Sequence, residues 1–108
     1  MTVRASTVML PLHLQNEVIH PDGQIRAGFG DDHQCRAAFV DAASEALKAA
    51  SKSGIPRVFV RMAFQVGGTD LPDNCELYRF VKRNEVMREG SWGAEFVDCL
   101  APDMPSDV

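Results

Sequence analysis

The chain has 108 residues, of which 45% are apolar and 24% are charged, and its net charge is −4. This length limits it to one domain, and the recurring apolar segments argue against disorder through most of the chain. The acidic balance gives nucleic-acid binding no electrostatic support, and no apolar run approaches the roughly 20 residues that a membrane helix needs. We expect no membrane association and a cytoplasmic location, since no signal-peptide pattern is present and the three cysteines lack CxxC spacing.

The first predicted element is a strand over residues 6–14, STVMLPLHL. Its nearly continuous apolar run is typical of a strand that is covered on both faces in a parallel sheet. Pro11 argues mildly against a central position, because proline cannot donate to the ladder. Residues 16–31 are predicted as loop, and HPDG within them as a turn in which Gly23 allows a positive φ.

Residues 32–52 are predicted as a helix. Asp31 or Asp32 can cap its N-terminus, and Gly54 is a natural residue just beyond its C-terminus. Apolar positions at helical spacing predict a slim core face that lets the helix lie close to a sheet. These positions are Phe39, Ala43, Ala46, Leu47 and Ala50.

A second strand is predicted over residues 55–64, IPRVFVRMAF. Residues 6–64 therefore have βαβ spacing, which favours parallel pairing and a right-handed crossover. Two strands and one long helix do not complete an α/β layer, because parallel strands need both faces covered. We expect either that a partner completes the core or that this chain is the N-terminal part of a longer domain.

The remaining segments alternate loop and short helix. Residues 65–74 are predicted as loop, 75–83 as a short helix and 94–100 as a helical turn. The Pro/Asp-rich tail is interpreted either as a frayed end or as the start of a further half. The apolar side of the short helix is expected to comprise Leu77, Phe80 and Val81.

Four stretches in order resemble the isochorismatase-like cysteine hydrolases. They are VMLPLHLQNEVIHPDG at 8–23, AASKSGIPRVFVRMAF at 49–64, LPDNCELY at 71–78 and MREGSWGAEFVDCLAP at 87–102. The first is similar to the family's strand that ends in Asp-Met-Gln-Asn, and the last to its Gly-Thr-Trp-Gly-Ala-Glu. Each motif alone is weak, whereas four in register over about residues 6–102 are fairly specific.

The resemblance implies a Rossmann-like three-layer α/β sandwich with a mostly parallel six-stranded sheet. Residues 1–108 would form a single, incomplete domain of this kind, comprising the βαβ unit and short helices. The implied reaction is attack by a cysteine thiolate on an amide or imide carbonyl, with an aspartate as base and a lysine that supports the charged intermediate. No cofactor is implied.

Residue by residue, the family's aspartate falls on His13 of this chain. The family's lysine would follow DCLAPDMP, and its cysteine would lie far beyond residue 108, so Lys82, Cys35, Cys75 and Cys99 match neither. A neutral imidazole can accept a proton, so His13 is our candidate catalytic base. The alternative is a histidine at a strand end that is hydrogen-bonded to loop backbone.

The other candidate residues each have a structural alternative. Gln15 is a candidate substrate-binding residue, although its amide and that of Asn16 can equally satisfy backbone groups where strand becomes loop. Trp92 is a second candidate, with a packing or subunit contact as the alternative. For Arg61 a salt bridge is the favoured role.

We expect no metal site, because the spacings between His13, His20 and His33 fit no ligand signature. The three cysteines are expected to be buried small hydrophobes, with Cys35 the least implausible nucleophile.

Two functions follow. One is an isochorismatase-family hydrolase, or the N-terminal fragment of one, that acts on a small amide, imide or related metabolite when complete. The other is a non-catalytic pseudoenzyme or half-domain that assembles with another chain or a second copy. We therefore expect a small-molecule substrate if the protein is active, and a homo-oligomer or a complementing chain as its partner.

Overall fold

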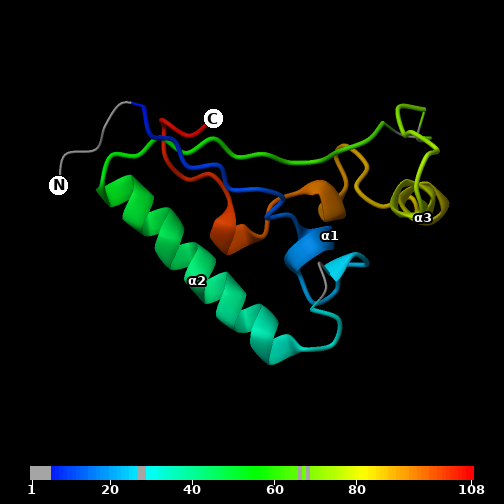
Figure 1. Cartoon of the computed structure of the whole chain (residues 1–108), viewed down its shortest axis with the longest axis horizontal. Coiled ribbons are helices and arrows are strands. Elements are labelled where there is room, and N and C mark those ends of the chain that lie inside the picture. The colour runs from blue at the N-terminus through cyan, green and yellow to red at the C-terminus, as the bar shows by residue number, and fades with distance from the viewer. Residues whose placement is uncertain (1–5, 27–28, 66, 68) are drawn as a thin grey trace.

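A computed structural model describes residues 6–26, 29–65, 67 and 69–108. Residues 27–28 of the predicted loop 16–31, and residues 66 and 68 of the predicted loop 65–74, lie outside this set. The helical elements in chain order are α1 (Asn16–Ile19), α2 (His33–Lys52), α3 (Glu76–Asn84) and the 3₁₀ helices η2 (Trp92–Ala94) and η3 (Asp98–Leu100). In Figure 1, α2 runs obliquely below the two long extended segments, near them at its C-terminal end and away from them at its N-terminal end, and α3 lies beyond their far end.

The two segments predicted as strands are extended and lie side by side in parallel. Met9 pairs with Arg57 and Leu12 with Val60. The pairing consists of isolated bridges, and no continuous strand is formed within the described residues. Pro11 is compatible with this pairing because its carbonyl accepts the Val60 N–H at 2.9 Å, which needs no proline N–H.

The segment around residues 57–64 is central among the extended segments. Backbone groups of Pro56, Val58 and Val60 hydrogen-bond to the first segment and, further along, Phe64 pairs in parallel with Arg88. On its opposite edge, the Phe59 N–H donates to the Val108 carbonyl at 2.7 Å and the Val108 N–H to the Arg57 carbonyl at 3.1 Å. Val108 therefore lies against this opposite edge.

The predicted long helix is confirmed. Asp32 is its N-cap, with a side-chain oxygen that accepts the Cys35 N–H at 2.9 Å. Gly54 follows its C-terminus with φ +71°, a conformation that glycine adopts without steric cost. Leu47 of α2 packs with Leu14 in the first core cluster, whose other buried members are Ile19 and Leu100.

The predicted core face of α2 is only partly correct. Leu47 and Ala50 are buried, whereas Ala46 and Phe39 are exposed. The first turns of α2 instead bury Arg36, which is 2% exposed. Helical spacing predicted the amphipathic pattern, but an alanine stripe has no large side chain to fix which face turns inward.

The predicted loop 16–31 contains a short helix, α1, which the prediction missed. The HPDG turn inside it is confirmed by the hydrogen bond from the Gly23 N–H to the His20 carbonyl at 2.9 Å. The reason given for Gly23 was wrong, because its φ is not positive. Glycine is required there by close packing, since a Cβ would lie 2.4 Å from the Asn16 carbonyl oxygen.

The C-terminal third differs from the prediction in two places. The helix predicted over 75–83 is confirmed as α3, with Val81 buried, but Leu77 is 50% exposed. The single turn predicted over 94–100 is instead two 3₁₀ turns, because the residues between them are extended and Phe96 pairs with Gln15.

The tail is held in place, so the frayed-end interpretation is wrong. Arg57 is 4% exposed and contacts Asp107 through two hydrogen bonds of 2.8 and 2.5 Å. A further bond of 2.6 Å joins Arg57 to Asp103. The hydrogen bonds from Arg57 lower the pKa of the Asp107 carboxyl. The bonds to Asp107, and then the bond to Asp103, raise the pKa of Arg57.

One face of the paired segments is uncovered. Val8, Leu10 and Leu12 alternate along the first segment and are 48%, 56% and 55% exposed. Met9 and Phe59, on the opposite face, pack against the first core cluster. The radius of gyration is 15.4 Å, whereas a compact domain of this length would have roughly 13 Å. The architecture is therefore open on one side.

Within the described residues, no helix combines the length and apolar character required to cross a membrane.

Candidate functional site

His13 lies at the carboxyl end of the first extended segment, where ligands collect in parallel α/β folds. Its φ is +56°, a left-handed conformation that costs energy for a residue with a Cβ. Its backbone N–H donates to the Val60 carbonyl at 2.8 Å. The ring Nδ1 is buried and has no hydrogen-bond partner among the described residues. Strain and an unpaired buried polar atom together are typical of a functional position.

A cavity of about 220 Å³ lies beside His13. Its other walls come from Val18, Ile25, Met62, Leu77, Tyr78 and Val81. Val18 and Ile25 belong to α1 and the following loop, while the last three come from α3. The cavity can therefore accept an apolar group, and His13 supplies its only ring nitrogens among the described lining residues.

Gln15 lies in the interior and is 0% exposed. Its Nε2 donates to the carbonyls of Met62 and Ala94, both at 2.7 Å, and its Oε1 accepts the Met62 N–H at 2.9 Å. The expectation that this amide satisfies backbone groups is confirmed. Substrate contact by Gln15 stays a prediction. Gln15 is connected to the His13 cavity through its hydrogen bonds to Met62, which lines that cavity.

Asn16 and Glu17 connect the same region to the Trp92 motif. The Asn16 Nδ2 donates to the Trp92 carbonyl at 2.8 Å. Glu17 is buried, and its Oε1 accepts the Gln24 N–H at 2.8 Å. A Cβ at Gly93 would lie 2.1 Å from the Glu17 Oε2, so a glycine at this position lets the two segments meet.

The Trp92 side chain lies apart from the His13 cavity. It is 47% exposed, and its ring meets the His20 ring edge-on with centroids 4.9 Å apart. Neither Trp92 nor Gln15 lines the His13 cavity, so the structure does not gather the three candidate site residues around one space. Substrate contact by Trp92 stays a prediction.

The cysteines differ from expectation. Cys35 and Cys99 are exposed and Cys75 is half-buried, so the prediction that they are buried hydrophobes is wrong for the first two. Cys35 lies in the first turn of α2, whose outer surface the solvent reaches. Across the described residues, no group of three or more His, Cys, Asp or Glu side chains comes together.

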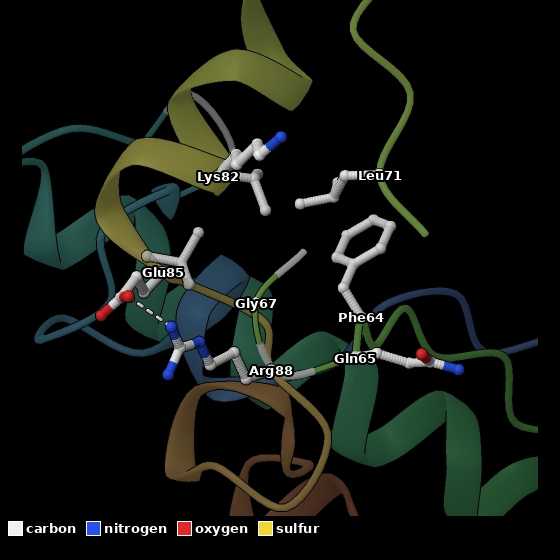
Figure 2. A pocket seen from close by; sticks show the side chains of 9 residues that line it. Phe64, Gln65, Gly67, Leu71, Lys82, Glu85 and Arg88 are labelled. Carbon is white, nitrogen blue, oxygen red and sulfur yellow. Dashed lines mark ion pairs between the residues drawn. The ribbon is translucent and has the colours of Figure 1, made fainter. Parts of the chain in front are cut away.

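A second cavity lies between Phe64, Leu71 and α3 (Figure 2). Lys82 borders it, and Glu85 forms an ion pair there with Arg88. Its volume is about 50 Å³, well below the roughly 300 Å³ of small-molecule pockets. Its size therefore makes this second cavity a poor candidate for a small-molecule site.

The salt bridge expected for Arg61 is confirmed, because its Nη2 lies 2.8 Å from the Glu89 carboxylate. This hydrogen bond raises the pKa of Arg61. The sequence prediction missed the apolar walls from Met62 and Tyr78. Tyr78 is the only tyrosine of the chain and lies in the third motif, which was a usable signal.

Taken together, these features define an α/β protein whose candidate site lies at the carboxyl end of its first parallel segment. The sequence matches the family model described as the isochorismatase domain over residues 7–108. The chain belongs to the isochorismatase family.

A solved cysteine hydrolase from Pseudomonas syringae pv. phaseolicola is similar in fold, with a TM-score of 0.73 and 20% sequence identity. The alignment covers 94% of this chain and 44% of that one, so this chain spans less than half the length of the hydrolase. No curated protein matches the sequence.

Proposed function

We propose that this chain is the N-terminal part of an isochorismatase-family hydrolase. The complete protein acts on the C–N bond of a small amide, an imide or a related metabolite. The observation that carries the proposal is the position of His13. By sequence resemblance it falls on the family's aspartate position, and it lies at the carboxyl end of a parallel segment and against an apolar cavity.

In this role, the neutral imidazole of His13 accepts a proton during attack on the carbonyl carbon. The lysine and the nucleophilic cysteine are supplied by polypeptide beyond Val108. The 108 residues alone are therefore expected to leave simple amides intact. The uncovered face formed by Val8, Leu10 and Leu12 supports this proposal, because such a face needs a further layer.

The test is an amide-hydrolysis assay of the pure chain beside the longer product of the same reading frame. We expect turnover by the longer product, loss of that turnover in its His13→Ala variant, and none by the 108-residue chain. Turnover by the short chain that disappears on His13→Ala would overturn the claim that essential groups lie elsewhere. Full activity of the longer product after His13→Ala would remove His13 from the reaction.

A second candidate function is a non-catalytic half-domain that assembles with a second copy. The exposed apolar row at Val8, Leu10 and Leu12 favours it, since exposed apolar patches mark interaction sites. Sedimentation equilibrium of the chain tests it. A dimer that Leu10→Lys dissociates without unfolding would support this function, whereas a stable monomer would contradict it.

A further inference from the structure

A groove separate from the His13 cavity lies between α1 and the first turns of α2. Its volume is about 270 Å³, close to the roughly 300 Å³ at which small-molecule pockets begin. Ile19, Val40 and Val97 supply apolar walls, and Arg36 borders it. We call it the α1–α2 groove.

Arg36 is a buried cation without a buried anion. Its side chain is 2% exposed. Among the described residues, its guanidinium contacts the His33 Nδ1 at 2.6 Å, the Gly30 carbonyl at 2.7 Å and the face of the Phe29 ring, whose centroid lies 5.7 Å away, and its Nε has no hydrogen-bond partner. The ion pairs of the described residues include none to Arg36, although every Asp and Glu of the chain is described. Buried charges are normally paired with an opposite charge. The unpaired Arg36 cation therefore favours binding of an anion in the groove.

Two histidines line the groove together with Arg36, and each carries one ring N–H donor when neutral. A guanidinium can only donate, so the His33 Nδ1 accepts from Arg36, and a neutral His33 ring carries its proton on Nε2. The His20 Nδ1 accepts the Asp22 N–H at 3.0 Å, so its proton is also on Nε2. Both residues line the groove. Asp41 also borders it, but Asp41 is exposed and its charge is screened by water.

From this arrangement we propose that the α1–α2 groove binds a small organic carboxylate with an apolar body. The carboxylate is held by the Arg36 charge and the N–H groups of His20 and His33. The apolar body packs against the groove walls. This site is independent of the reaction proposed for the His13 cavity.

Cyclohexanecarboxylate and its neutral analogue cyclohexanecarboxamide are suitable probes, because they share an apolar body and differ in charge. Titration is followed by NMR through the methyl groups of Val40 and Val97. We expect saturable shifts with the carboxylate at a dissociation constant of about 1 mM or below. We also expect binding of the carboxamide to be weaker by about 10-fold or more. Equal binding of the two probes, or no saturable shift, overturns the proposal.

Variants separate this site from nonspecific binding. Arg36→Gln should weaken carboxylate binding by about 10-fold or more if the protein stays folded. Ala37→Phe fills the groove from an exposed position, and Ala38→Phe is its control because Ala38 does not line the groove. Loss of binding in Ala37→Phe alone supports the site even if Arg36→Gln unfolds. Unchanged binding in Ala37→Phe overturns the proposal. The proposal is also overturned if the chain forms a dimer that Arg36→Gln dissociates and the carboxylate does not bind.

Discussion

The side-chain carboxamide of Gln15 hydrogen-bonds to both the N–H and the carbonyl of Met62, at 2.9 and 2.7 Å. In a parallel ladder the backbone of the neighbouring strand makes both bonds, as it does here at Val60. The Gln15 amide therefore replaces a peptide group where the first segment turns into α1. Backbone pairing resumes two residues later, between Phe64 and Arg88.

Replacing Gln15 with leucine should therefore destabilise the fold strongly. Leucine is similar in size to glutamine. The variant, however, leaves three backbone groups without partners: the Met62 N–H, the Met62 carbonyl and the Ala94 carbonyl. Because each unsatisfied buried group costs about 1–3 kcal/mol, we expect the free energy of unfolding to fall by at least about 3 kcal/mol. Urea unfolding measures this change.

The matched control is Gln34→Leu on the exposed side of α2, which should change the free energy of unfolding by less than about 0.5 kcal/mol. If Gln15→Leu lowered the free energy of unfolding as little as the control does, the Met62 backbone groups would have to find other partners. The Gln15 amide would then not replace a peptide group of the ladder.

Gly23 should tolerate no side chain. Alanine there would place its Cβ 2.4 Å from the Asn16 carbonyl oxygen and 2.5 Å from that of Glu17. Because both obstacles are backbone, α1 and the turn have to separate, and we expect a loss of about 3 kcal/mol in thermal unfolding experiments. Gly30→Ala is the control, since Gly30 has open space and a φ of +57°. That variant should cost only about 1 kcal/mol, from backbone strain alone, and equal losses in the two variants would contradict the steric explanation.

The sequence predicted the parts of the fold that depend on local spacing. Helical periodicity predicts α2 and its Asp32 cap, and βαβ spacing predicts the parallel pairing of the two extended segments. α1 was missed because a helix of one turn has no periodicity, and its position depends on Gln15 and Asn16 bonds to residues more than 70 positions away. Contacts at that separation have no local signal.

The candidate site was predictable only in part. The family motif identified the position of His13, but the left-handed backbone and the unpaired Nδ1 depend on the surrounding packing. The burial of Arg36 was likewise unpredictable, because arginine on a helix surface is normally solvated. The fixed tail was missed because the Arg57–Asp107 pair spans 50 positions.

Asp107 should stabilise the protein in a pH-dependent way. Because its pKa is lowered in the folded state, its contribution is present above the unfolded pKa and is lost as the pH falls through the folded value. Asp107→Asn should therefore cost about 3 kcal/mol at pH 7, and this cost should shrink as the pH falls below about 5. Urea unfolding of both proteins across this range gives the difference.

Asp98→Asn, at an exposed carboxylate of η3, is the control and should show a small difference at every pH. A cost of Asp107→Asn that stays constant into acid would mean that the tail is held by packing, and the ion pair would lose its assigned role.

His13 should lower the free energy of unfolding, because its φ of +56° and its unpartnered Nδ1 both oppose folding. Asparagine tolerates the left-handed region better than histidine and is smaller, so His13→Asn should raise the free energy of unfolding by about 0.5–1 kcal/mol. Glu85→Asn is the control, since Glu85 has a φ of +55° but is exposed, and its gain should be smaller because the substitution also removes its ion pair with Arg88. Thermal unfolding of the three proteins decides the matter. A loss of stability in His13→Asn would show that the imidazole supports the fold, and strain would no longer be an argument for a functional role of His13.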